Sequence, residues 1–173
     1  MLLTSTVKLN SLHIIFKKNY PIAKIVLNKP ETGNTLDLQL AKELYYATHD
    51  TASDNKIKAL ILTANGKLFS GGGNLKYLLS NKDEVKKTLL DMTMYFHGAI
   101  SRMARMDSPT IVGINGTAGG GGFSLAITGD IIYSVKAAKF TLAYTNAGLS
   151  STVFSNMSNV EQITIGSAHS LTL

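Results

Sequence analysis

Apolar and polar residues alternate in two short runs near the start of the chain, in "LHIIFKKNYPIAKIVLNKP" at residues 12–30. A period of two is that of a β-strand, and the polar "KNYP" between the runs predicts a hairpin. The period then changes to three or four, with apolar residues at Leu36, Leu40, Leu44 and Ala47. This spacing predicts a helix, for which Asn34 or Thr35 is placed as the N-terminal cap.

Compact apolar runs further along the chain predict buried strands. They are "IKALILTAN" at 57–65, "TIVGIN" at 110–115, "DIIYSV" at 130–135 and a shorter "AKFTLAY" at 138–144. A long helix over about 83–106 separates the first two and ends before Pro109, and "GFSLAIT" predicts a short helix before the third. Strands that alternate with helices predict a largely parallel sheet with right-handed crossovers. Ligands bind such sheets beyond the carboxyl ends of the strands.

Two glycine-rich segments follow strands at that edge, "LFSGGGNLKYL" at 68–78 and "GTAGGGGFS" at 116–124. Glycine after a strand often serves a tight turn or close packing of a helix. It also exposes peptide N–H groups to a ligand, and the start of a helix adds unpaired donors. Two such segments at equivalent places favour the second interpretation. One N–H group from each can then bind a single oxygen atom, as in an oxyanion hole.

Other catalytic and phosphate-binding motifs fit the sequence poorly. No Gly-Lys pair precedes Ser or Thr, as a Walker A loop requires, and the glycines lack the spacing of the dinucleotide fingerprint. "GGFSLA" resembles a nucleophile elbow, with Asp130 and His169 following, but Ser124 comes nine residues after Asn115 ends the strand. There are no cysteines, and the four histidines lack metal-binding spacing, so we expect no metal site.

Length and charge narrow the class of protein further. The 173 residues predict a single domain, and 45% hydrophobic residues are enough for a real core. Only 16% are charged, which hints at surface covered in an oligomer, while the net charge of +6 favours an anionic ligand. The basic residues are scattered and lack interleaved aromatics, which argues against nucleic acid. No apolar run approaches the roughly 20 residues of a membrane span.

Three segments resemble, in order and spacing, the enoyl-CoA hydratase/isomerase (crotonase) superfamily. They are "VLNKPETGNTL", "LFSGGGNLKYL" and "SPTIVGINGTAGGGGFSLAITGDIIYSVKAAKFTLAYTNAGLS", within about residues 10–150. The resemblance implies an α/β fold, the crotonase-like (ClpP/crotonase) spiral of ββα units. It also implies an acyl-CoA thioester as the partner, with coenzyme A as part of the substrate and no separate cofactor. The resemblance further implies that the protein forms a homotrimer or hexamer in the cytoplasm and is not attached to a membrane.

The resemblance implies roles for individual residues. The backbone amides of Gly73 and Gly121 would form the oxyanion hole around the thioester oxygen. Lys29 takes the place of a basic residue near the CoA phosphates. The adenine and thioester would lie along residues 71–76, which include Gly71, Gly72, Asn74, Leu75 and Lys76. The expected reaction is double-bond isomerisation, or a related hydratase-type enolate reaction, on a medium-chain or unsaturated acyl-CoA.

The chain also departs from the family pattern. Ser124 and Tyr144 occupy the positions of the family's two catalytic glutamates, so a two-glutamate hydratase mechanism has no residues to use. The Ser124 hydroxyl can still orient water, and Tyr144 can donate a proton or simply pack. Isomerases of the family carry an acid after "GLS", where this chain has "GLSSTVFSN". His97 on the long helix is a minor candidate, since a packed or surface role explains it more simply.

The end of the sequence departs furthest from the family. "ITIGSAHSL" at 163–171 bears only a faint resemblance to the next family helix, and the C-terminal helices that build the family's trimer are absent from this sequence. Two further functions therefore stay open beside the enzyme. One is a catalytically silent homologue that acts as a binding or scaffolding subunit. The other is RNA binding, which the net charge permits but the residue pattern does not favour.

Overall fold

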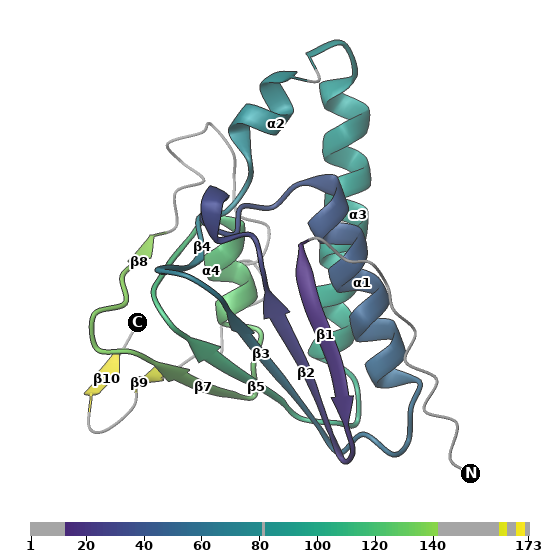
Figure 1. The fold of residues 1–173 in the computed structure, drawn as a ribbon, viewed down its shortest axis with the longest axis vertical. Coiled ribbons are helices and arrows are strands. Elements are labelled where there is room, and N and C mark those ends of the chain that lie inside the picture. Colours follow the sequence, from purple (N-terminus) through teal and green to yellow (C-terminus); the bar gives the residue numbers. More distant parts are fainter. Residues whose placement is uncertain (1–12, 81, 142–162, 166–168, 172–173) are drawn as a thin grey trace.

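The computed structural model describes residues 13–80, 82–141, 163–165 and 169–171. Within this part of the chain, the larger of the sheets has the strand order β1-β2-β3-β5-β7 (Figure 1). Its strands are β1 (Ile14–Asn19), β2 (Ile22–Leu27), β3 (Ala59–Ala64), β5 (Thr110–Ile114) and β7 (Ile131–Ser134). β1 and β2 form the predicted antiparallel hairpin, and every later pairing in this sheet is parallel. The largely parallel sheet expected from the sequence is confirmed.

A smaller, wholly parallel sheet has the order β4-β6-β8. It consists of β4 (Leu68–Ser70), β6 (Thr117–Gly119) and β8 (Phe140–Thr141). The sequence pattern did not predict β4 and β6, because each is three residues long and joins a glycine-rich segment. Consecutive strand pairs thus contribute one strand to each sheet, β3 and β4, then β5 and β6, then β7 and β8. This repeat is the spiral of ββα units that the resemblance implies.

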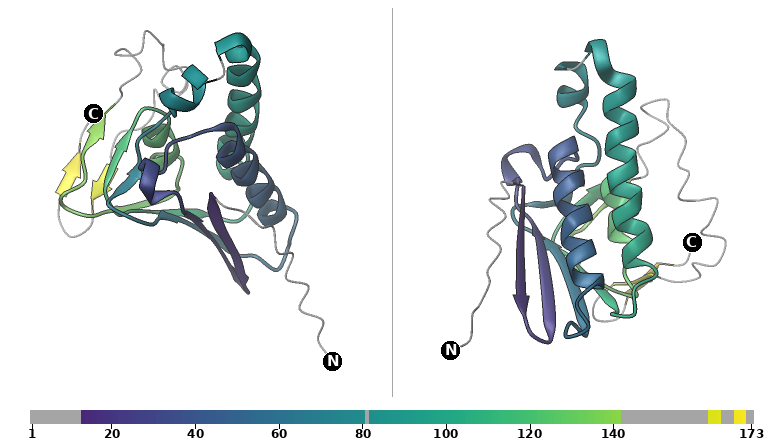
Figure 2. Two further views of the ribbon diagram at one scale, coloured as in Figure 1. Left: turned by 45° about the horizontal axis from the view of Figure 1, so that its top comes forward. Right: turned by 90° about the vertical axis from the view of Figure 1, so that its right-hand side faces the viewer.

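Two long helices lie side by side across one face of the larger sheet, α1 (Leu38–Ala52) and α3 (Val85–Met103) (Figure 2). The expected cap of α1 was wrong. Asp37 caps this helix, because its Oδ1 accepts a hydrogen bond of 2.9 Å from Leu40 N. Asn34 is instead buried with φ 52°, and its side chain accepts from Lys29 N and donates to the carbonyls of Asn65 and Leu68.

The hydrophobic core lies between these helices and the sheet. β2 buries alternate residues, as expected for a strand with one covered face, and β3 and β5 do the same. The helices contribute residues at helical spacing to the same core. Its fully or almost fully buried members include Ala23, Ile25, Leu27, Leu40, Leu44, Leu60, Leu62, Ala99, Met103, Val112 and Ile114.

The remaining elements correct several predicted boundaries. The helix expected over about 83–106 is shorter, and a separate helix α2 (Leu75–Ser80) with a 3₁₀ turn η2 (Lys82–Glu84) precedes it. The short helix predicted near "GFSLAIT" is α4 (Gly121–Ala126), which packs on β4 and β6. Residues 163–171 are not helical where described, since β9 (Ile163–Ile165) and β10 (His169–Leu171) pair antiparallel. A 3₁₀ turn, η1 (Pro30–Thr32), precedes α1.

Candidate active site

The small sheet brings the two glycine-rich segments together. β4 and β6 are parallel neighbours, with Leu68 paired to Thr117 and Ser70 paired to Ala118. Because parallel strands end at the same edge of a sheet, the residues that follow them lie next to each other. Residues 71–73 follow β4 directly, and residues 120–122 follow β6. The structure therefore confirms that both segments belong to one region.

Some of these glycines are required by packing alone. Gly72 has φ 86°, and a Cβ built there would lie 2.6 Å from the backbone oxygen of Gly119. A Cβ on Gly122 would lie 2.5 Å from both Cβ and backbone oxygen of Ser70. Both distances are far inside van der Waals contact, so any side chain would push the two segments apart. A Cβ on Gly73 would meet no atom within 4 Å.

The backbone around Gly73 leaves its N–H group available. Leu36 N donates to Gly72 O at 2.7 Å, and Asn74 N donates to Leu36 O at 2.8 Å. Peptide groups alternate in direction along an extended chain, so the Gly73 N–H points away from Leu36. Gly121 is the first residue of α4 and has no acceptor within the helix. Neither N–H group donates a hydrogen bond to another described residue.

Both glycines line one pocket of about 230 Å³. Glycines of the two segments line this pocket together with Leu36 and with side chains from α1, α2 and α3, which are apolar except for Thr93 and His97. Its described lining is Leu36, Ala41, Gly71, Gly73, Leu75, Leu78, Leu89, Met92, Thr93, Phe96, His97, Gly120 and Gly121. The two glycines whose N–H groups have no described acceptor therefore lie at one pocket, and its mostly apolar lining is suited to a hydrocarbon chain.

The comparisons with known proteins bear on the family and the fold of the chain. The sequence profile of the family described as enoyl-CoA hydratase/isomerase matches residues 17–173. The chain belongs to this family. It is 29% identical to 4-chlorobenzoyl coenzyme A dehalogenase-2 of an Arthrobacter species over 138 residues, covering 79% of this chain and 50% of that protein. It is 28% identical to 1,2-epoxyphenylacetyl-CoA isomerase of Escherichia coli strain K12, covering 74% and 49%.

Solved structures of the family share the fold. An enoyl-CoA hydratase from Shewanella pealeana superposes with a TM-score of 0.76 at 25% identity, over 84% of this chain and 56% of the other. The crotonase-like fold class expected from the sequence is thus confirmed. The chain spans about half the length of the curated relatives it matches.

The residues that the family resemblance places around coenzyme A do not all line the pocket. Gly71 and Leu75 line the pocket, whereas Gly72 is buried beneath it. The Asn74 side chain accepts a hydrogen bond of 3.0 Å from Tyr77 N and so caps α2. Lys76 is exposed on α2, outside the described lining. Asn74 thus has a structural role whether or not it contacts a ligand.

Lys29 already has an anionic partner. Its Nζ donates to Asp37 Oδ2, and its side chain is only 16% exposed. His13 Nδ1 lies 3.1 Å from the other oxygen of the same carboxylate. Burial raises the pKa of Asp37, but the Leu40 N–H, Lys29 and His13 outweigh burial and hold that pKa below its usual range. The role of Lys29 near CoA phosphates stays a prediction, in competition with this ion pair.

Of the two positions that align with the family's glutamates, one lies within the described residues. Ser124 lies on α4, is 1% exposed and is outside the described lining. Tyr144 falls outside the described residues. Their predicted roles are neither supported nor contradicted by this geometry.

His97, a minor candidate in the sequence analysis, is placed at the pocket by the structure. It lines the pocket from α3 and is the one titratable side chain in the described lining. The signal was present in the spacing, because Leu89, Met92, Thr93, Phe96 and His97 follow the three-and-four repeat of a helix face. Placing that face against the glycines required the fold.

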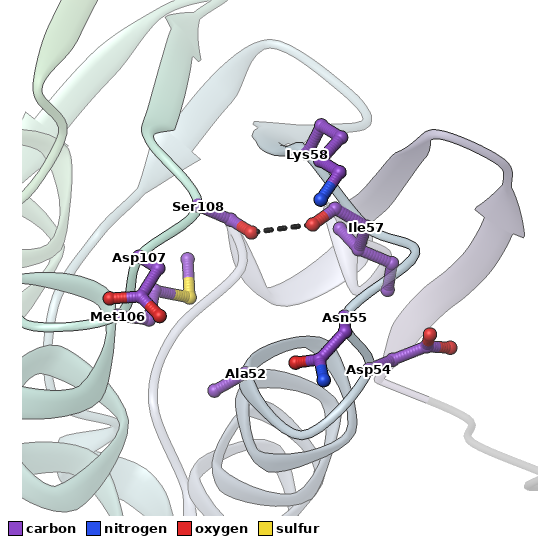
Figure 3. Close-up of a pocket in the computed structure, with 8 residues that line it drawn as sticks. All are labelled: Ala52, Asp54, Asn55, Ile57, Lys58, Met106, Asp107 and Ser108. Carbon is purple, nitrogen blue, oxygen red and sulfur yellow. Dashed lines mark hydrogen bonds between the residues drawn. The ribbon is translucent and has the colours of Figure 1, made fainter.

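A second pocket of about 200 Å³ lies at the opposite edge of the larger sheet, before β3 and β5 begin (Figure 3). A hydrogen bond of 2.7 Å from Ser108 Oγ to Ile57 O joins two of its lining residues. The side chains around it include Asp54, Asn55 and Asp107.

Among the residues that the structure describes, no group of three or more histidines and carboxylates is placed to hold a metal ion. In the same residues, no helix is both long and apolar enough to cross a membrane.

Proposed function

We propose that the protein binds an acyl-CoA thioester and stabilises its enolate, as an enzyme of the enoyl-CoA isomerase/hydratase type. The single observation that supports this most is the pair of unused N–H groups, of Gly73 and Gly121, at one apolar pocket. Removing a proton next to a thioester places negative charge on the thioester oxygen. Preorganised N–H donors aimed at such an oxygen contribute about 3–4 kcal/mol each when tested by removal.

The rest of the pocket is consistent with such a substrate. Leu75, Leu78 and Met92 provide a surface for an acyl chain. Coenzyme A is part of this substrate, so the proposal needs no separate cofactor. The net charge of +6 favours the approach of its phosphates. Lys76 is exposed on α2 beside the pocket residue Leu75 and is available to these phosphates. Gly71 and Asn74 are available to the thioester arm of the substrate.

Assembly and location belong to the same proposal. The trimer or hexamer draws support from β7, where Ile131 is 46% and Tyr133 is 58% exposed, a large apolar area for a free surface. Cytoplasmic location follows from the family resemblance alone. Gel filtration with light scattering would measure the oligomer directly.

A catalytically silent subunit is the second candidate. One observation favours it: the described lining contains no carboxylate, although the family's hydratases rely on two glutamates. Such a subunit would bind acyl-CoA in the same pocket without turning it over. The two functions differ only in chemistry, so a binding assay and a turnover assay on the same sample separate them.

The decisive experiment removes one donor. Gly121→Pro deletes the N–H, and proline is well tolerated at the first position of a helix, which is where Gly121 lies. We expect turnover of a panel of enoyl-CoA esters to fall by about a hundredfold or more. Gly121→Ala, which retains the N–H, is the matched control, and circular dichroism checks the fold of both.

The outcomes separate the two candidates. Equal turnover in a folded Gly121→Pro variant and in the unchanged protein would contradict the oxyanion-hole proposal. Calorimetric binding of acyl-CoA without turnover of any ester would establish the silent subunit instead. Lack of both binding and turnover would remove the acyl-CoA proposal itself.

A further inference from the structure

One face of α3 forms a continuous wall of the pocket. Leu89, Met92, Thr93, Phe96 and His97 all line it, and their spacing places them on one side of the helix. α3 is 19 residues long and packs against α1. Side chains on such a helix are held more firmly than side chains on a loop. His97 is therefore presented to the same space as Gly73 and Gly121.

His97 differs chemically from everything else on that wall. The other described lining residues are apolar, except for Thr93, or are glycines. The Thr93 hydroxyl is already bonded to the carbonyls of Leu89 and Leu90. Among the described residues, no hydrogen bond or ion pair engages the His97 ring, which lies beside the Phe96 ring with centroids 6.2 Å apart. Its nitrogens are thus available to a ligand.

We infer that His97 is the side chain that moves the proton in this pocket. The inference rests on the proposed function, because it requires an acyl thioester held by Gly73 and Gly121. An imidazole is suited to this task, since one nitrogen can accept a proton and later return it. The inference assigns the role that the sequence left without a residue, because neither family glutamate is present.

The proton transfer balances without any further reactant. A neutral imidazole nitrogen takes a proton from C2 of a 3-enoyl thioester, and the C–H electron pair moves into the carbonyl as a dienolate. The N–H groups of Gly73 and Gly121 hold the negative oxygen. The imidazolium then gives its proton to C4, and the electron pair returns to form the C2–C3 double bond. The product is the 2-enoyl thioester, and the histidine is neutral again.

The experiment measures proton transfer apart from binding. The full chain, His97→Gln, His97→Ala and His49→Gln are incubated in D₂O with a 3-enoyl-CoA and with its saturated analogue. Mass spectrometry follows deuterium at C2, and calorimetry measures affinity. His49 is the matched control, because it is exposed on α1 and outside the described lining.

We expect His97→Gln to lower the exchange rate by about a hundredfold or more, with affinity unchanged within about threefold. Added imidazole should restore part of the exchange in His97→Ala, a result that loss of packing alone would not give. His49→Gln should exchange as the unchanged protein does. Equal exchange in His97→Gln and the unchanged protein would overturn the inference and leave the proposed function standing. Binding without exchange in the unchanged protein would overturn both the inference and the enolate chemistry.

Discussion

A methyl group added at Gly72 would collide with the neighbouring glycine-rich segment, whereas one added at Gly73 would not. The Cβ of an alanine at Gly72 would lie 2.6 Å from Gly119 O and 3.3 Å from Gly120 Cα. Both are backbone atoms and cannot rotate away. At Gly73 the same atom has no neighbour within 4 Å. We therefore expect the same substitution to have different consequences for stability at these two adjacent glycines.

The magnitude follows from two separate costs. Gly72 has φ 86°, in the left-handed region where a side chain costs about 1–2 kcal/mol. Overpacking adds about 1–3 kcal/mol, so Gly72→Ala should lower the free energy of unfolding by about 2–5 kcal/mol. Gly73→Ala has neither cost and should change that free energy by less than about 1 kcal/mol.

Urea unfolding followed by circular dichroism measures both variants. With an m value of about 2 kcal/mol per M, Gly72→Ala should lower the midpoint by about 1 M or more. Gly73→Ala should unfold close to the unchanged protein, yet alter acyl-CoA affinity, because Gly73 lines the pocket. Equal midpoints for the two variants would refute the close approach of the two segments on which the site depends.

Two further predictions concern the framework around the site. Asp37→Asn keeps a cap for α1 but removes the charge that pairs with Lys29, so it should lower unfolding free energy by about 1.5–3 kcal/mol at pH 7. Because the folded-state pKa of Asp37 is lowered, its contribution is present above the ordinary aspartate value of about 3.9 and is lost as pH falls through the folded-state pKa. Urea midpoints of Asp37→Asn and the unchanged protein should therefore converge as pH falls through the folded-state pKa of Asp37, and a constant gap would contradict the ion pair. Leu62→Ala, at a fully buried core position, should cost about 2–5 kcal/mol, while Leu79→Ala, 63% exposed, should stay within about 0.5 kcal/mol in the same assay.

Elements with long, regular patterns could be predicted from the sequence. The hairpin, α1, α3 and the strands of the larger sheet all follow from the spacing of apolar residues. β4 and β6 could not be predicted, because three residues are too few to show a period. Their pairing joins Leu68 to Thr117, far apart in the chain, and no local signal reports such a contact.

The candidate site, too, could be predicted from the sequence only in part. The glycine-rich segments predict where a ligand would approach, because bare backbone is visible in a sequence. The sequence did not show which glycines serve packing, as Gly72 does, and which face open space, as Gly73 does. Nor did it show that Lys29 is paired with Asp37, since a lysine beside a loop has the same appearance with or without a partner. His97 stayed a minor candidate because a histidine on a long helix is more simply explained as a packed or surface residue, and its place at the pocket required the fold.

The spacing of the small sheet explains why two backbone donors suit this pocket. Parallel strands lie about 4.8 Å apart, and an N–H group binds oxygen at about 2.9 Å between heavy atoms. One oxygen can therefore accept from two donors that are up to about 5.8 Å apart, which is wider than the strand spacing. Gly73 and Gly121 leave neighbouring strands of this sheet, and the contact of Gly72 with Gly119 keeps the segments close beyond the last pair. A donor pair built on β4 and β6 would thus need no side chain to set its separation, and the one titratable side chain of the described lining, His97, comes from α3.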